Sequence, residues 1–526
     1  MSVSNEEHLT LLISKIVQDI QKLPIYSQLQ KAARFEVSKP SLKLNDLKQG
    51  VKTALSNAGW EKKLRNEVYK CVQKNATIPQ PLIPVEHYKE PLVYMRKAQV
   101  NWEKRILKSL NSMCTELNIP LAKKRPEREQ RDLLGRWTEL GQELPVDLSK
   151  FRPVYAPKDF LEVLAGVKNP NCTFADAPSF QHFWGVVQVP LKIKNIHELR
   201  LQYSEMSINQ CQAGVDDCSF IPQELFESER SKLAKKVIAH NHGPVAQEFA
   251  KKGCNTSHRA EIWSQILGVT VDEIDRLYYE QLKHYFLQHD LLVDALIFKD
   301  VKLTASNDDQ YFVFEDYIYQ VLLPFSRDTH VLEHFANLSA TPAKSYIRGK
   351  LGINEFAVNY PPNGVIPFHG FSMYVAPLCF IYNDVVKLYY VFREMYTRYF
   401  CRLHCISSHP QGIVSLCLLF ESLLQCYEPQ LFAHLKSVGA QPLKMAFKWL
   451  IRAFSGYLSS DQVLLLWDRI LAYGSMELLP VLAYAIFSFR KNNLIQVQSY
   501  AAAEAVLADL TTLNVIPIIQ LCLFAK

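Results

Sequence analysis

The 526-residue sequence lacks a hydrophobic run that is long enough to cross a bilayer. Its longest apolar runs are 374–382, 478–489 and 515–525, and each is shorter than the roughly 20 residues of a membrane-spanning helix. The N-terminus, MSVSNEEHL, also lacks the basic start and the apolar stretch of a secretory signal peptide. We therefore expect a cytoplasmic protein, and peripheral association with endomembranes stays open as an alternative.

The sequence contains no CxxC pair, although it has 12 cysteines. Without a secretion signal, scattered cysteines indicate reduced, mostly buried thiols rather than a disulfide framework. One short stretch has the composition of a metal site, with Cys401, His404, Cys405 and His409. A single helix cannot surround a tetrahedral zinc ion, and no second pair of ligands is nearby. We expect packed side chains and no metal there, and a metal-dependent enzyme built on this cluster remains a third hypothesis.

Several enzyme signatures are missing as well. The sequence has no GxxxxGK[ST] phosphate loop and no GxGxxG, GxSxG or HExxH motif. These absences argue against an enzyme with its own nucleotide site, so we expect no cofactor. What the sequence does have is a globular balance, with 48% hydrophobic and 21% charged residues, which is unlike the composition of a disordered chain.

The net charge of +7 is unevenly distributed. Residues 1–150 contain 26 Lys and Arg against 17 Asp and Glu, whereas the remaining residues contain 33 against 35. The basic surplus favours anionic lipid headgroups or an acidic partner, although solvated helix faces are the interpretation that we prefer. The basic cluster at 123–131 is interrupted by Pro126 and two glutamates, so we expect no nucleic-acid partner.

Apolar residues recur at helical spacing along most of the chain. The stripes that predict helices in the first part lie at 9–23, 44–55, 60–68 and 102–117. One alternating run, 187–193, predicts a strand, which Pro190 restricts to the edge of a sheet. Because the pattern is almost wholly helical from residue 259 onward, we expect an all-α fold.

Six motifs follow one another after residue 258. In chain order they are RAEIW (259–263), IFKDVKLT (297–304), FHGFSMYVAPL (368–378), PQLFAHL (429–435), FKWLIRAFSGYL (447–458) and LLWDRIL (465–471). The series resembles the TBC (Tre-2/Bub2/Cdc16) domain of Rab GTPase-activating proteins. This resemblance implies an all-helical TBC domain, preceded by a largely helical N-terminal region.

The resemblance and the helical stripes together divide the chain into five segments. We expect an N-terminal helical region, a Pro-rich linker, a helical and irregular region, the TBC domain and a C-terminal helical extension, at 1–75, 76–92, 93–250, 253–490 and 491–526, respectively.

The resemblance also implies a partner, a Rab-family small GTPase that is bound in its GTP form and acts in vesicle trafficking. In the family, an arginine that closes an IxxDxxR motif and a glutamine in a YxQG motif assist GTP hydrolysis, and GTP and Mg²⁺ belong to the partner. Here Ile297 and Asp300 match the first motif, but Leu303 occupies the arginine position. Gly370 matches the second motif, but His369 occupies the glutamine position. Both catalytic positions are therefore substituted.

These substitutions leave two functions open, a GTPase activator and an effector or scaffold that binds a Rab protein without accelerating hydrolysis. The expected GTPase-binding positions are Asp300, Lys302 and Gly370. Lys302 carries charge beside Leu303, but an ammonium lacks the planar fork of arginine, so we do not expect it to replace the missing side chain. Arg327 or Arg348 is a displaced arginine finger if the alignment shifts within the long stretch 327–364.

The other residues that match the family are expected to be structural. Trp263, Trp449 and Trp467 are large apolar side chains that we expect in the helical core rather than at a partner surface. Asp468 is expected to cap a helix or to form an ion pair within the domain. Arg259 is the expected ion-pair partner in the fold.

Overall fold

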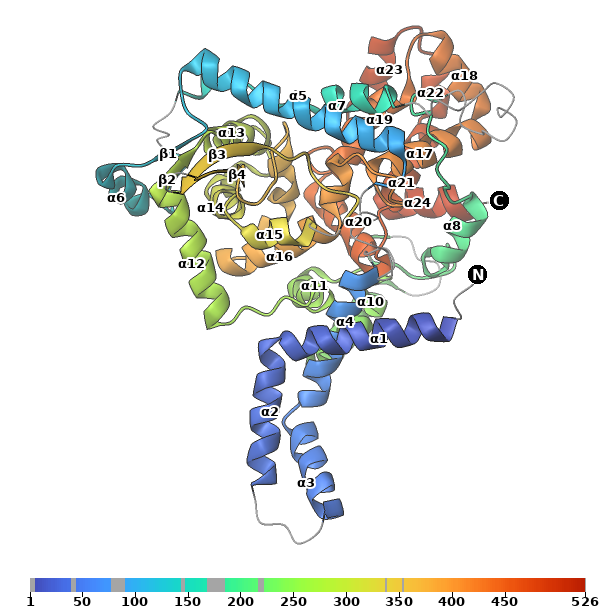
Figure 1. Cartoon of the computed structure of the whole chain (residues 1–526). Coiled ribbons are helices and arrows are strands. Elements are labelled where there is room, and N and C mark those ends of the chain that lie inside the picture. Colours follow the sequence, from blue (N-terminus) through green and yellow to red (C-terminus); the bar gives the residue numbers. More distant parts are fainter. Residues whose placement is uncertain are drawn as a thin grey trace.

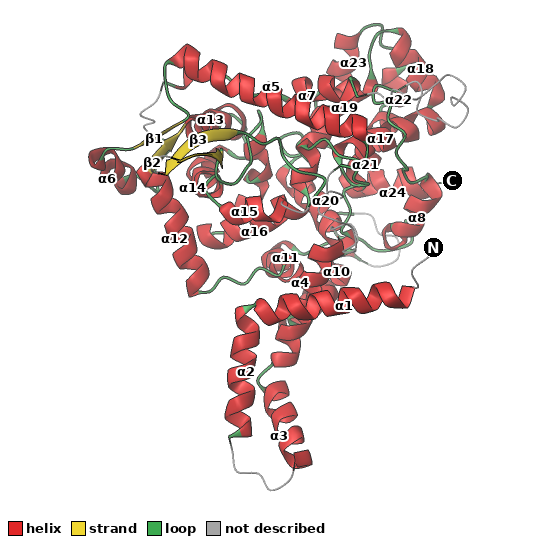
Figure 2. Ribbon diagram, in the orientation of Figure 1, coloured by secondary structure: helices red, strands yellow, loops and turns green. Residues whose placement is uncertain are grey.

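The computed structural model describes residues 5–38, 44–76, 90–142, 147–167, 185–215, 222–335, 338–351 and 354–525. Helices dominate these residues, and the only regular strands among them form two small two-stranded sheets (Figures 1 and 2). The all-α prediction is therefore confirmed. The Pro-rich linker predicted at 76–92 falls largely outside the described residues. In the described ranges, no helix combines the length and the apolar character that crossing a bilayer requires.

The chain begins with four helices, of which the second and third project from the body of the molecule (Figure 1). They are α1 (Asn5–Lys22), α2 (Pro24–Val37), α3 (Leu44–Asn57) and α4 (Trp60–Ala76). Pro24 starts a new helix because its fixed φ and missing N–H suit a first helical position. We call the pair α2 and α3 the helical arm. No residue of α2 is buried, so the arm contributes little to the main core.

Helix α4 attaches the arm to the body at α10 (Gly243–Ala250). The side-chain amide of Asn66 donates to the carbonyl of Asn241 at 2.8 Å and accepts from the N–H of Gly243 at 3.0 Å. The N–H of Gly243 lies at the start of α10, where backbone donors have no partner within the helix. Asn66 therefore works as a cap that is supplied by another helix.

Helix α5 (Val93–Leu117) lies along the body and buries one face (Figure 1). The buried residues at helical spacing are Met95, Trp102, Ile106, Leu110 and Met113. The helix ends at Asn118, which adopts a left-handed conformation with φ of 52°, as many helix ends do. After it, β1 (Ala122–Lys124) pairs antiparallel with β2 (His289–Leu291), with Ala122 opposite Leu291.

The described residues between 125 and 258 contain eight helical elements. They are α6 (Glu127–Gly135), η2 (Leu148–Lys150), α7 (Pro157–Ala165), α8 (Ile196–Gln202), η4 (Ser204–Met206), α9 (Gln223–His240), α10 and η5 (Thr256–His258).

The prediction of a strand at 187–193 is wrong. The described residues there form no ladder, although Val187 and Val189 are buried as the alternating pattern implies. The carboxylate of Glu421 accepts the N–H groups of Val186 at 2.7 Å and of Val187 at 3.3 Å, and Pro190 has no N–H to donate. A distant side chain takes the place of a partner strand.

The remaining chain is a helical body. Its elements are α11 (Arg259–Leu267), α12 (Glu273–Gln288), α13 (Leu292–Asp300), η6 (Val301–Ala305), η7 (Phe312–Phe314), α14 (Glu315–Phe325), α15 (Thr329–His334), β3 (Tyr346–Leu351), β4 (Asn354–Asn359), η9 (Phe371–Tyr374), η10 (Ala376–Phe380), α16 (Val385–Arg398), η11 (Phe400–His404), α17 (Ile413–Tyr427), α18 (Pro429–Ser437), α19 (Pro442–Ile451), α20 (Ser460–Tyr473), α21 (Leu478–Phe489), α22 (Lys491–Leu494), α23 (Tyr500–Val506) and α24 (Val515–Phe524). Strands β3 and β4 form an antiparallel hairpin, with Tyr346 opposite Asn359.

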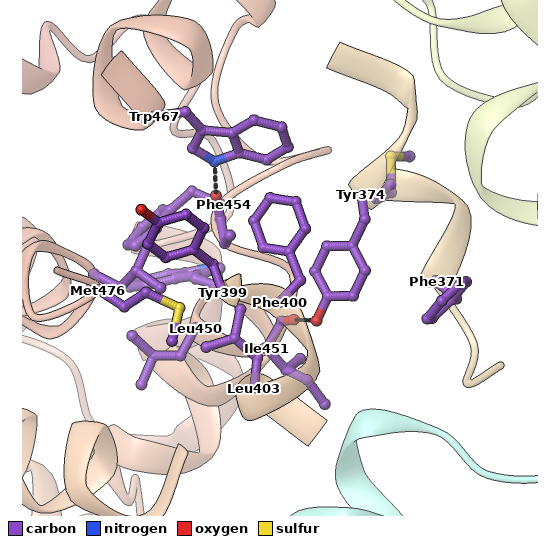
Figure 3. Packing of buried hydrophobic residues seen from close by; sticks show 14 of the residues in the cluster. Phe371, Tyr374, Tyr399, Phe400, Leu403, Leu450, Ile451, Phe454, Trp467 and Met476 are labelled. Atoms are coloured by element: carbon purple, nitrogen blue, oxygen red, sulfur yellow. Dashed lines mark hydrogen bonds between the residues drawn. The ribbon is translucent and has the colours of Figure 1, made fainter. Parts of the chain in front are cut away.

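Aromatic side chains dominate the centre of the core (Figure 3). The rings of Tyr374 and Phe400 stack with their centroids 4.6 Å apart, and Phe400 also contacts the ring of Trp467. The indole N–H of Trp467 donates to the carbonyl of Ala453 at 3.0 Å. The same continuous core includes buried residues of α5 and α7, so helices that precede the TBC-like motifs pack directly on the body that carries them.

Candidate functional site

Asp300 joins the two segments that carry the predicted catalytic positions. Helix α13 ends at Asp300 and continues as a single π-helical turn, η6. The buried carboxylate of Asp300 accepts the N–H of Gly370 at 2.5 Å and the N–H of Ser372 at 2.8 Å. Because these partners are 70 and 72 residues away in sequence, the aspartate sets where the second motif lies relative to the first.

Gly370 is required at its position for two reasons. Its φ is +106°, a region that side chains rarely adopt. An added Cβ would lie 2.1 Å from Nε of Arg452. Arg452 is itself engaged, since its Nη2 donates to the carbonyl of His369 at 3.1 Å. The glycine therefore lets an arginine approach and hold the backbone of the second motif.

Leu303 and His369 border one small hollow at the surface. Leu303 is 45% exposed, and the His369 side chain is 33% exposed. Nδ1 of His369 lies 3.7 Å from Oδ1 of Asp300, which is beyond hydrogen-bond distance. The hollow has a volume of about 10 Å³, room for about one water molecule. Its lining consists of Arg152, Pro153, Leu296, Lys299, Asp300, Leu303, Pro367, Phe368 and His369.

The structure therefore brings the two predicted catalytic positions, Leu303 and His369, together, but it does not bring Lys302 to them. The ammonium of Lys302 donates to the carbonyl of Gly141 at 3.0 Å and forms an ion pair with Glu315 at 2.5 Å. Lys302 is absent from the lining of the hollow. As the neighbour of Leu303 in a helical turn, it faces another side of the element.

Arg327 cannot serve as a displaced arginine finger. Its side chain has no exposed area, and its Nη2 donates to Asp294 at 2.7 Å and to the carbonyl of His289 at 2.9 Å. A guanidinium that is buried and paired inside the body has no route to a partner protein. Arg348 is exposed on β3 and does not line the hollow.

Arg259 and Asp468 form a buried ion pair within the helical body. The guanidinium donates to the carboxylate from Nε at 3.1 Å and from Nη2 at 3.0 Å, and the side chains are 6% and 0% exposed. Asp468 also accepts the indole N–H of Trp263 at 2.7 Å and the N–H of Cys254 at 3.0 Å. Burial lowers the pKa of Arg259, but the charge and the hydrogen bonds of Asp468, together with smaller contributions from Cys254 and Asp461, outweigh burial, so the net pKa is raised. These contacts connect α11 to α20.

Trp449 and Trp467 lie in the core, where they are 1% and 0% exposed. Cys401, His404 and Cys405 are also buried, and His409 is partly buried. His404 lies between two tyrosines, with Nε2 2.9 Å from the hydroxyl of Tyr396 and Nδ1 3.4 Å from that of Tyr155. Burial lowers the pKa of His404 to about 3, so the imidazole is neutral. Among the described residues, no group of three or more His, Cys, Asp and Glu side chains has the arrangement of a metal site.

Sequence reasoning did not identify Arg152, which lines the hollow beside Leu303 and His369. Arg152 lies between η2 and α7, outside every motif that marks the catalytic positions. No local pattern distinguishes it from other basic residues of the N-terminal part, because its place at the hollow depends on contacts with residues more than a hundred positions away.

Comparisons with known proteins found three similarities. A family model described as the Rab-GTPase-TBC domain matches residues 368–495. The human protein TBC1 domain family member 19 is 60% identical over 523 residues, which is 99% of this chain and 99% of that protein. A solved structure, the crystal structure of the Chlamydomonas flagellar RabGAP TBC domain, matches with 12% identity and a TM-score of 0.42, over 64% of this chain and 98% of that one.

Proposed function

Because the chain belongs to the TBC family of Rab GTPase-activating proteins, we propose that it binds a Rab-family GTPase in its GTP form. The contact surface is the face that carries residues 300–303 and 367–370, which we call the motif face. One observation carries the proposal: Asp300 holds the backbone of Gly370 and Ser372, so both motifs share one exposed hollow. GTP and Mg²⁺ reside on the partner, and this chain needs no cofactor of its own.

The residues at the catalytic positions cannot supply the usual assistance to hydrolysis. As the γ-phosphoryl group leaves, negative charge spreads over its oxygens, and an inserted guanidinium is worth about 10³ to 10⁵ in rate. That factor corresponds to roughly 4 to 7 kcal/mol of barrier. Leu303 has neither charge nor a hydrogen-bond donor. His369 presents an imidazole where a carboxamide would orient the water, and its backbone carbonyl is already bound by Arg452.

A second function follows from this chemistry. The chain is then an effector or scaffold that binds GTP-loaded Rab through the motif face and leaves the rate of hydrolysis unchanged. The observation that favours it is the pair Leu303 and His369 at the two positions where the family carries its assisting side chains. The two functions share the binding step and differ only in the chemical step, so separate assays distinguish them.

The first measurement is binding of the full chain to a panel of purified Rab proteins, each loaded with a non-hydrolysable GTP analogue or with GDP. We expect at least one Rab to bind in the analogue-loaded form only. A variant that places charge in the hollow, His369→Glu, should weaken that binding. Arg131→Glu is the matched control, because Arg131 is 79% exposed on α6 and pairs only with another exposed side chain. Absence of binding across the panel contradicts the proposal.

The second measurement is single-turnover GTP hydrolysis on the Rab that binds. Acceleration by the wild type supports the activator, whereas binding without acceleration supports the effector. The double variant Leu303→Arg and His369→Gln tests whether the face has the right geometry for catalysis. Both positions are partly exposed, so these side chains enter solvent rather than the core. If only the double variant accelerates hydrolysis, the wild-type protein is an effector whose motif face still has the geometry that catalysis requires.

The helical arm supports peripheral contact with an anionic endomembrane as part of the same function. Lys31, Arg34, Lys48 and Lys52 are exposed on α2 and α3, and surface cations of this kind are attracted to anionic leaflets. Binding to phosphatidylserine vesicles should fall as salt rises and should drop in a variant with all four residues changed to glutamate. Lys104→Glu with Lys108→Glu on α5, where both lysines are exposed, is the control. Binding that is insensitive to salt would exclude this contact.

A further inference from the structure

A segment from outside the TBC-like motifs forms part of the motif face. Residues 151–155 connect η2 to α7, and we call them the bridging segment. Phe151, Val154 and Tyr155 are buried in the main core, at 8%, 7% and 5% exposure. Arg152 and Pro153 lie between these anchors and line the hollow that also contains Leu303 and His369. The bridging segment is therefore a fixed part of the face rather than a loose loop beside it.

Hydrogen bonds tie the bridging segment to both motifs. The ammonium of Lys299, one helical turn before Leu303, donates to the carbonyl of Phe151. The N–H of His369 donates to the carbonyl of Tyr155 at 3.0 Å, and the ring of Tyr155 packs on Phe368 with centroids 5.9 Å apart. These contacts hold Arg152 at a set position relative to the two substituted catalytic residues.

Arg152 is the more exposed of the two arginines near the second motif. Arg452 donates to the carbonyl of His369 within the site. The Arg152 side chain is 44% exposed, its Nη1 donates to the hydroxyl of Ser109 at 2.8 Å and its Nη2 donates to the carbonyl of Ser109 at 3.3 Å. Its Nε is 3.6 Å from a carboxylate oxygen of Glu116, which is 55% exposed. Exposed ion pairs contribute little net stability, so a phosphate competes readily for this guanidinium.

We propose that Arg152 supplies, from another part of this chain, the guanidinium that Leu303 does not, by contacting the phosphate oxygens of GTP on the docked Rab protein. The inference rests on docking at the motif face. In the step that it assists, the oxygen of a water molecule bonds to the γ-phosphorus, and the bond to the β–γ bridging oxygen breaks. The electron pair of that bond stays on GDP, and the proton of the water ends on the released phosphate. The guanidinium donates to the oxygens on which charge grows.

The test is single-turnover hydrolysis by the Rab protein that binds, with full-length wild type, Arg152→Ala, Arg152→Lys and the control Arg131→Ala. We expect wild type and Arg131→Ala to accelerate hydrolysis equally. Arg152→Ala should lose about 10³-fold of the acceleration. Arg152→Lys should lose most of it as well, because an ammonium keeps the charge but lacks the two-pronged fork.

A parallel binding assay separates a chemical role from a structural one. Affinity for the analogue-loaded Rab protein should stay nearly unchanged in Arg152→Ala, whereas formation of the complex with GDP and aluminium fluoride, which resembles the transition state, should be lost. Acceleration by Arg152→Ala at the wild-type rate overturns the assignment. Wild type that binds but does not accelerate overturns it too, while the docking proposal stands. If no Rab protein binds, docking fails and this inference fails with it.

Discussion

Replacing Asp468 with alanine is expected to be among the most damaging single changes in the body. The carboxylate is fully buried and accepts four hydrogen bonds, two from the guanidinium of Arg259, one from the indole of Trp263 and one from the backbone of Cys254. A second guanidinium, that of Arg469, lies 3.9 Å away and is also fully buried. Alanine removes the only carboxylate that these contacts share.

The magnitude follows from the burial of the partners. Removing one member of a buried ion pair costs about 3 to 5 kcal/mol, because the other charge stays buried without compensation. Each donor that is left without an acceptor adds about 1 to 3 kcal/mol, although water entering the cavity recovers part of this. We therefore expect a loss of about 5 kcal/mol, which is a large share of the roughly 5 to 15 kcal/mol of a typical domain.

The assay is denaturant unfolding of Asp468→Ala and wild type, followed by both tryptophan fluorescence and far-UV circular dichroism. The two probes must coincide before a free energy is derived. Asp461→Ala is the control, since Asp461 is an exposed residue of the same helix and should cost less than about 1 kcal/mol. An Asp468→Ala midpoint equal to that of the control would refute the reasoning, because the buried pair would then have no energetic role.

Three further predictions concern the motif face and two buried titratable groups. Gly370→Ala should lower the free energy of unfolding by about 1 to 3 kcal/mol in denaturant titrations, since it forces a side chain into φ of +106° against Arg452; an unchanged value would contradict this. Burial raises the pKa of Glu421 from 4.5 to about 7, so its contribution to stability is present below pH 4.5 and is lost as pH rises through 7. Glu421→Gln should therefore be more stable than wild type by up to about 3 kcal/mol at pH 8 and show no such gain at pH 4.5, and an equal difference at both pH values would exclude the pKa shift. Burial lowers the pKa of His404 from 6.5 to about 3, so stability falls as pH drops below 6.5, and His404→Phe should show a shallower loss between pH 6.5 and 5; an unaltered slope would argue against a neutral buried imidazole.

Helix positions were largely accessible to sequence reasoning. The apolar stripes at 9–23 and 102–117 correspond to α1 and α5 in the structure. A stripe with helical spacing identifies a helix because the repeat of 3.6 residues is a local property of the backbone. The alternating run at 187–193 failed as a strand prediction for the converse reason. Alternation reports which side chains are buried, but a strand also needs a neighbouring backbone to pair with.

The residues of the candidate site also differ in whether the sequence alone could predict them. Sequence motifs alone predicted that Leu303 and His369 occupy the two catalytic positions, since each substitution is read in a short ungapped segment. The distances between these segments were not accessible, because the bond from Gly370 to Asp300 spans 70 residues. The burial of Arg327, which excludes this residue as a displaced arginine finger, was not accessible from the sequence either.

The sequence by itself determined that the chain is helical and that it carries the ordered TBC motifs, and it predicts that Leu303 and His369 stand at the two catalytic positions of the family. Only the tertiary structure decided which distant residues lie beside these two. Phe151 and Tyr155 are buried in a core shared with the body, and this packing holds Arg152 at the hollow. Residue types and their local periodicity can be read directly from the sequence. Distant side chains, in contrast, come close together only when helices bury their apolar faces against one another.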